Sequence, residues 1–114
     1  MKLRLRSNSV RIRMGPSEVE QLAASGLVED AVEFVPNPLV YMVHSSKDAK
    51  QLEITFLNGW VTVTLPADQA RKWVTSDEVG IEGIFRGISV LVEKDWPCVH
   101  SNAGDNDDTF PRPA

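Results

Sequence analysis

The sequence predicts an α+β domain made from a duplicated ββαββ unit, with eight mostly antiparallel strands and two short helices. Three observations support this fold class. Apolar and polar residues alternate with period two in several short runs. In each half of the chain, a proline and then an amphipathic helical pattern follow the first two runs. The apolar positions of the two halves also align at a constant offset of 51 residues.

The first element is a β-hairpin over residues 1–14. Apolar residues occupy every second position of both runs, and basic residues stand between most of them. These apolar residues are Met1, Leu3, Leu5, Val10, Ile12 and Met14. The turn falls in Ser7-Asn8-Ser9, where an asparagine tolerates a positive φ.

A helix is predicted next, between Pro16 and Gly26. Ser17 and Glu20 have the spacing of a capping box, and Gly26 is placed as the C-cap. Two extended runs follow at residues 28–35 and 39–45, separated by Pro36-Asn37-Pro38.

The second half repeats this order. Strands are predicted at 52–56 and 60–65 around the hairpin signal Asn58-Gly59. A short helix follows Pro66, and two more strands are predicted at 80–85 and 88–93. The offset of 51 also aligns Phe34 with Phe85. Trp60, Trp73 and Trp96 are most simply explained as core or capping residues.

Eight strands with one apolar face can bury that face inside a barrel or between two packed sheets. We favour the barrel, because closure removes exposed strand edges. One β-rich domain is placed at residues 1–100, with pseudo-repeats at 1–46 and 51–96. Residues 101–114 are placed as an irregular tail rich in acid and proline.

The composition indicates an ordinary soluble domain, with 42% apolar and 25% charged residues among 114. The single cysteine, Cys98, excludes an intrachain disulfide and favours a reducing compartment. No apolar run approaches the roughly 20 residues that span a bilayer. A cytoplasmic protein without a membrane segment is therefore expected.

The charge is unevenly distributed along the chain. The net charge is −4, yet the first thirteen residues hold five basic side chains and no acid. The five basic residues are Lys2, Arg4, Arg6, Arg11 and Arg13. Period two places all five on one face of the predicted hairpin. A turn at Ser7-Asn8 sets Arg4 opposite Arg11, and a turn at Asn8-Ser9 sets Arg6 opposite Arg11.

Like charges on facing residues destabilise a sheet, so something must offset them. Acids from neighbouring strands are the favoured explanation, and the candidates are Glu29, Glu33, Glu82 and Glu93. The alternative is that the five basic residues form a site for an anion, because arginine matches phosphate geometry. An anionic small molecule or an acidic protein is then the expected partner. Nucleic acid is a weaker candidate, because no aromatic residues interleave the basic ones.

Other chemistry has little support in the sequence. Cys98 and His100 are two strong zinc ligands where four are needed, and no metal or cofactor is predicted. A pairing of Cys98 with His44 follows no catalytic spacing rule. The leading hypothesis is a non-catalytic binding domain, and an enzyme acting on phosphate esters or polyphosphates is the alternative. That enzyme would need Glu33, Glu53 and Glu82 in one cavity with the arginines.

The sequence resembles one family of proteins, and its predicted architecture resembles a second. The start Met1-Lys2-Leu3-Arg4-Leu5-Arg6-Ser7-Asn8-Ser9-Val10-Arg11-Ile12-Arg13, together with Leu91-Val92-Glu93-Lys94-Asp95 and Phe110-Pro111, resembles a family of small bacterial proteins of unknown function. The eight-stranded architecture is similar to the tunnel barrels of triphosphate-hydrolysing enzymes, whose first strand carries Glu-x-Glu-x-Lys/Arg. Here that strand reads Lys2-Leu3-Arg4-Leu5-Arg6, without the metal-holding glutamates.

Overall fold

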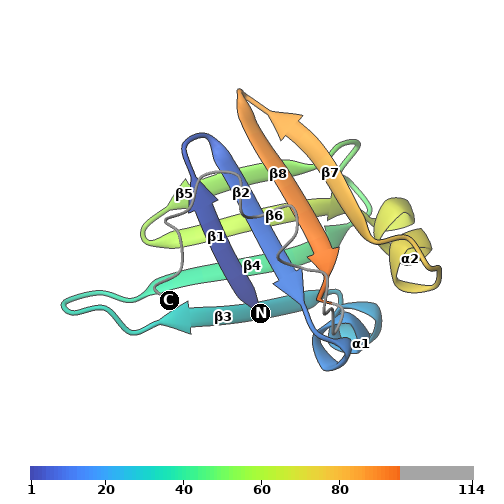
Figure 1. Cartoon of the computed structure of the whole chain (residues 1–114), viewed down its shortest axis with the longest axis horizontal. Coiled ribbons are helices and arrows are strands. Elements are labelled where there is room, and N and C mark those ends of the chain that lie inside the picture. Colours follow the sequence, from blue (N-terminus) through green and yellow to red (C-terminus); the bar gives the residue numbers. More distant parts are fainter. Residues whose placement is uncertain (96–114) are drawn as a thin grey trace, which may run out of the picture.

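The computed structural model describes residues 1–95, which form eight strands and two helices in the order ββαββ followed by ββαββ (Figure 1). The strands are β1 (Lys2–Arg6), β2 (Ser9–Met14), β3 (Leu27–Val32), β4 (Leu39–Ser46), β5 (Glu53–Leu57), β6 (Trp60–Pro66), β7 (Gly80–Phe85) and β8 (Ile88–Lys94). The helices are α1 (Pro16–Ser25) and α2 (Ala67–Val74). The predicted order of elements is thus confirmed. The end of the predicted domain and the predicted tail, including Trp96, Cys98 and His100, lie outside the described residues.

The strands form two four-stranded sheets. Sheet A has the order β1-β2-β8-β7, and sheet B has the order β3-β4-β6-β5. In each sheet the outer pairs are antiparallel and the central pair, β2 with β8 or β4 with β6, is parallel. The strands of one sheet run across those of the other (Figure 1). Two packed sheets of an α+β fold, one of the two predicted solutions, are confirmed.

The barrel that we favoured is wrong. Each sheet ends in edge strands, and within residues 1–95 no ladder joins one sheet to the other. The expectation rested on the need to remove edges, but edges can instead be protected by charge. The edge strand β1 carries Lys2, Arg4 and Arg6 at alternate positions, which disfavours pairing with a further strand.

The helices explain why each sheet mixes the two halves of the chain. After β2, α1 carries the chain to sheet B, and after β6, α2 carries it back to sheet A. Each sheet therefore joins a hairpin from the first half to a hairpin from the second. The two helices pack against each other near one end of the sheets (Figure 1). Neither helix described in residues 1–95 is long and apolar enough to cross a membrane.

The core lies between the two sheets and under the helices. Inward positions at alternate residues of the central strands are almost fully buried, as period two predicts. Core residues with no exposed surface are Ile12, Val43, Val63, Leu65 and Val92 on these strands and Trp73 on α2. Trp73 is the largest of these residues. Its helix, α2, contacts β4 and β6 of sheet B and β7 of sheet A, so the helix packs against both sheets.

The start of α1 differs from its prediction. Gly15 is the N-cap and Pro16 is the first helical residue, because proline suits the first turn, where its missing N–H is not needed. The carboxylate of Glu18, not that of Glu20, accepts the backbone N–H of Gly15 at 2.8 Å. The Ser17 and Glu20 capping box is therefore wrong by two residues. The C-cap at Gly26 is confirmed, with φ of 77° and its N–H donated to Leu22.

The second hairpins of the two halves depart from the constant offset. β3 ends at Val32 rather than at residue 35, because the prolines of the 33–38 connection cannot donate to a ladder. Phe34 consequently lies in this loop and is exposed, whereas Phe85 ends β7 and packs against the core. The β7–β8 turn, at Arg86 and Gly87, is much shorter.

Candidate functional site

The five basic residues lie on the outer face of sheet A, away from the core. On this face the strand register forms three rows of neighbours. The rows are Arg6, Ser9, Ser89 and Ile84; Arg4, Arg11, Leu91 and Glu82; and Lys2, Arg13, Glu93 and Gly80. We call Lys2, Arg4, Arg6, Arg11 and Arg13 the basic face. The structure thereby places these side chains at the surface rather than inside a tunnel.

The hairpin register is the first of the two predicted ones. The turn is at Ser7 and Asn8, and Arg4 stands opposite Arg11 while Lys2 stands opposite Arg13. Ser7, not Asn8, takes the positive φ, at 50°. Facing residues of an antiparallel pair have Cβ atoms about 5 Å apart, so like charges are held close together along the hairpin.

Glu93 is the principal counter-charge on this face. It stands opposite Arg13 on the parallel strand β8, and its Oε1 lies 2.7 Å from Nε of Arg13 and 2.9 Å from Nε of Arg11. Glu93 is only 7% exposed, which makes it the single buried charged residue in the described chain. Beside it on β7 is Gly80, where a Cβ would come within 2.7 Å of the Val92 carbonyl oxygen. Of the acids predicted to offset the facing basic residues, Glu93 thus does pair with two of them.

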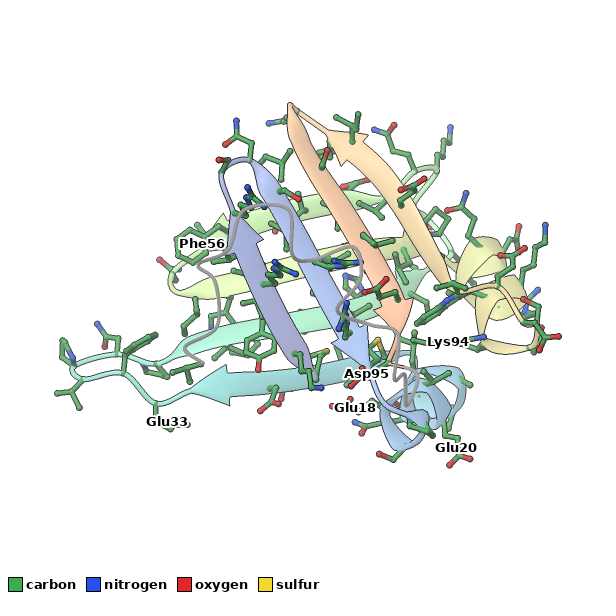
Figure 2. All side chains as sticks on the ribbon, in the orientation of Figure 1. Glu18, Glu20, Glu33, Phe56, Lys94 and Asp95 are labelled. Carbon is green, nitrogen blue, oxygen red and sulfur yellow. The ribbon has the colours of Figure 1, made fainter. Side chains whose placement is uncertain are left out.

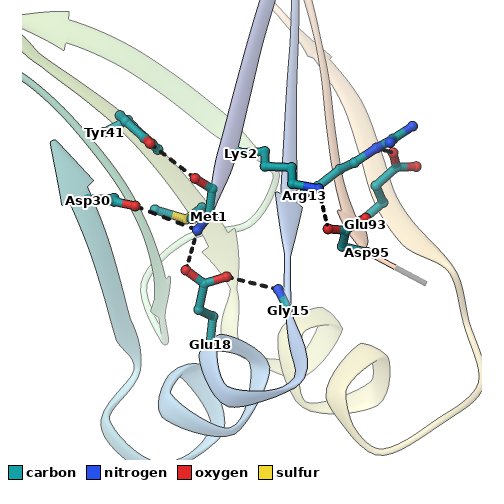
Figure 3. A network of polar contacts seen from close by, with 9 residues as sticks. All are labelled: Met1, Lys2, Arg13, Gly15, Glu18, Asp30, Tyr41, Glu93 and Asp95. Carbon is teal, nitrogen blue, oxygen red and sulfur yellow. Dashed lines mark hydrogen bonds and ion pairs between the residues drawn. The ribbon is translucent and has the colours of Figure 1, made fainter. Parts of the chain in front are cut away.

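A second counter-charge stands at the same end of the face. Nζ of Lys2 lies 2.8 Å from a carboxylate oxygen of Asp95, which directly follows β8 (Figure 3). The hydrogen bond from Lys2 holds the pKa of Asp95 below its usual range, and the positive charges of Lys2 and Arg13 add to this effect. Acids therefore gather around Lys2 and Arg13, near the C-terminal end of β8.

The other predicted acids lie elsewhere. Glu29 is on β3 and Glu53 on β5, both in sheet B, and Glu33 is in the loop that projects from that sheet (Figure 2). Glu82 is on β7, with Leu91 between it and Arg11. The three carboxylates expected of a hydrolase thus do not converge. Among residues 1–95 no group of three His, Cys, Asp or Glu side chains could hold a metal.

A groove of about 620 Å³ runs over sheet A beside Arg11. We call it the sheet A groove. Its lining residues are Ser9, Arg11, Glu82, Gly83, Ile84, Ser89, Val90 and Leu91. Its floor is formed by β7 and β8, and Ile84 is 74% exposed there. The groove therefore places apolar surface directly beside the basic face.

A second polar cluster joins the start of β1 to sheet B, and the sequence analysis missed it. The Met1 amine is paired with the carboxylate of Glu18 and lies 3.6 Å from Asp30, and the Tyr41 hydroxyl donates to the Met1 carbonyl at 3.1 Å (Figure 3). Met1 directly precedes β1, and the other three residues come from α1, β3 and β4. No local pattern could have revealed the cluster, because its members meet only when the two sheets pack.

The cluster perturbs the only tyrosine of the chain. Burial raises the pKa of Tyr41. The negative charge of Asp30, the interaction of its carboxylate with the Tyr41 hydroxyl, and the charge of Glu18 raise this pKa further. We expect the phenolate absorbance at 295 nm to appear above the usual pKa of about 10. Below that pH the phenol is neutral in both states, and its contribution to the stability of the fold is fully present. Above it the unfolded chain ionises first, so stability falls as pH rises.

Urea unfolding at pH 9 and pH 11 tests this, with Tyr41→Phe as the control. Between these two pH values, the free energy of unfolding should fall more in the wild-type protein than in Tyr41→Phe, because only the wild type has a phenol at this position. A midpoint of the absorbance change at or below 10 in the folded protein would contradict the expectation.

Comparison with protein-family models gives the chain a family. A family model described as a family of unknown function, DUF7009, matches residues 1–114. The chain belongs to the DUF7009 family. Searches of curated proteins and of solved structures found no match. The predicted resemblance to a family of unknown function is confirmed, and DUF7009 membership assigns no role to any residue.

Proposed function

We propose that the protein is a non-catalytic binding domain whose basic face takes an anionic small ligand or an acidic protein partner. The observation that carries the proposal is the cross-strand pair of Arg4 and Arg11 on the outer face of sheet A. Two facing guanidinium groups repel each other, and an anion that contacts both would offset the repulsion. Arginine forks suit the oxygen geometry of phosphate and carboxylate groups alike.

The exposed edge of sheet A supports the same part of the face. Glu93 contacts both Arg11 and Arg13, and Asp95 contacts Lys2. Arg4 and Arg6 stand on the edge strand β1, toward the turn of the hairpin. Exposure of this edge leaves room for a ligand to approach from solvent. We therefore propose Arg4, Arg6 and Arg11 as the centre of the site.

The alternative functions are less well supported. A phosphate hydrolase of the tunnel-barrel type needs several carboxylates around a metal, and Glu33 and Glu53 lie away from the arginines. Nucleic-acid binding would be helped by aromatic side chains for base stacking, and the three rows of the outer face contain none. The single cysteine supports a reducing compartment, and a cytoplasmic location stays a prediction.

Thermal unfolding in the presence of anions tests the proposal. The panel is phosphate, pyrophosphate, triphosphate, nucleotides, short RNA and an acidic peptide. A ligand at one hundred times its Kd should stabilise the fold by about 2.7 kcal/mol. We expect one phosphate-bearing or carboxylate-bearing member to raise Tm in the wild-type protein.

The double variant Arg4→Gln with Arg6→Gln should lose that shift. Lys47→Gln with Lys50→Gln removes the same charge from the loop after β4 and should keep it. No shift with any anion, or equal shifts in both variants, would count against the basic face as a site.

A further inference from the structure

The surroundings of Arg11 suit a particular kind of anion. On one side of Arg11 lies Arg4, and on the other side lies Leu91, with Ile84 in the next row. Arg4 and Arg11 form the cationic half of this surface, and Leu91 and Ile84 form an apolar half in the sheet A groove, with Glu82 at its far side. Inorganic phosphate or polyphosphate would use only the cationic half. A peptide with clustered carboxylates and a nearby apolar side chain would use both halves.

The chain itself contains a sequence of this chemistry. Residues 105–110 read Asp105-Asn106-Asp107-Asp108-Thr109-Phe110, with three carboxylates and an aromatic ring within six residues. This segment lies outside the described residues. We propose that residues 105–110 are a ligand of the basic face, with the aspartates toward Arg4, Arg6 and Arg11 and Phe110 toward Ile84. The proposal rests on the proposed function and names the partner of the same site.

The position of Asp95 makes the contact geometrically accessible. Asp95 is held at the end of β8 by Lys2, at the margin of the basic face. Asp105 follows ten residues later, and ten extended residues span up to about 33 Å. The row of Arg13 and the row of Arg11 are separated by two residues along a strand, or about 7 Å. The tether is therefore long enough to reach every row.

Tethering also makes the contact competitive. A ligand on a short linker acts at an effective concentration on the order of millimolar, so a weak contact is well occupied. An external acidic partner would then have to displace residues 105–110 before it binds. The basic face would thereby respond only to partners that are stronger or more concentrated than the chain's own acidic segment.

Fluorescence anisotropy with a labelled peptide of residues 104–111 tests this on the full chain. The variant Asp105→Asn with Asp107→Asn and Asp108→Asn removes the internal competitor. We expect this variant to bind the peptide at least about tenfold more tightly than the wild-type chain does. A matched variant, Asp48→Asn with Asp68→Asn and Asp77→Asn, has the same net charge and should bind like the wild type.

Two further variants locate the contact. Both are made in the chain in which Asp105, Asp107 and Asp108 are asparagine. There, Arg4→Gln with Arg6→Gln should weaken peptide binding. Ile84→Ser should weaken binding of the native peptide but not of a peptide with Phe110→Ser. The proposal would be overturned if the wild-type chain and the variant with Asp105→Asn, Asp107→Asn and Asp108→Asn bound the labelled peptide with equal affinity. If triphosphate binds while the peptide binds no chain, the inference fails and the proposed function stands. If neither probe binds any chain, both fail.

Discussion

Replacing Trp73 with alanine is expected to lower the free energy of unfolding by about 4 kcal/mol, the usual size of a tryptophan truncation in a core. Trp73 has no exposed surface and is the largest buried side chain of the described residues. It extends from α2, whose contacts reach strands of both sheets. The cavity left by alanine would therefore weaken the packing of sheet A, sheet B and the helix together.

A second substitution separates volume from polarity at this position. Nε1 of Trp73 is buried and has no hydrogen-bond partner within residues 1–95. An unpaired buried donor is itself unfavourable, so Trp73→Phe removes that defect while keeping most of the ring. We expect Trp73→Phe to cost far less than Trp73→Ala.

Urea unfolding followed by far-ultraviolet circular dichroism measures both changes. Trp60→Ala is the matched control, because Trp60 is 40% exposed on the outer face of sheet B, and it should cost about 1 kcal/mol or less. A loss below about 2 kcal/mol for Trp73→Ala would show that the site collapses around the smaller side chain.

Replacing Glu93 with glutamine is expected to cost about 3 kcal/mol, because breaking a buried ion pair leaves charges without compensation. Glu93 is buried, and it is the carboxylate shared by Arg11 and Arg13. Glutamine keeps the shape of the side chain but not its charge. The loss therefore measures the electrostatic role of Glu93 rather than its packing.

The same substitution should strengthen anion binding. Removing the negative charge that contacts Arg11 and Arg13 increases the attraction between Arg11 and an external anion. Hence Glu93→Gln is expected to lower stability and to lower the Kd for whichever anion stabilises the wild-type protein. Glu82→Gln, an exposed acid in the next strand, should change stability by less than about 0.5 kcal/mol.

Unfolding in urea and anion titrations on the same preparations give both quantities. Combining Glu93→Gln with Arg13→Gln should cost less than the sum of the two single changes, since the two residues are in contact. Additive costs would mean that the ion pair contributes little, and an unchanged anion affinity would argue that Glu93 does not tune the face.

Local patterns predicted the elements and their buried faces. Alternation in the hairpin placed Val10, Ile12 and Met14 on one face and the arginines on the other, and the structure shows that the apolar face is the buried one. Trp73, which the sequence analysis expects in the core or as a capping residue, is fully buried. These predictions succeeded because periodicity depends only on neighbouring residues. The capping box of α1 failed because two start signals stood two residues apart and Pro16 favoured the earlier one.

The sequence by itself therefore determined the eight strands, the two helices, the separation of apolar and charged faces, and the clustering of five cations on one hairpin. Only the tertiary structure showed that the charged face points to solvent. Only the tertiary structure decided which strands pair across the two halves. The parallel pair of β2 and β8 joins residues about eighty positions apart, and no short-range pattern selects that partner over another strand with an apolar face. This pairing brings Glu93 beside Arg11 and Arg13, and it opens the groove next to Arg11. The chemistry of the surface follows from non-local packing, whereas the residues that compose it follow from local alternation.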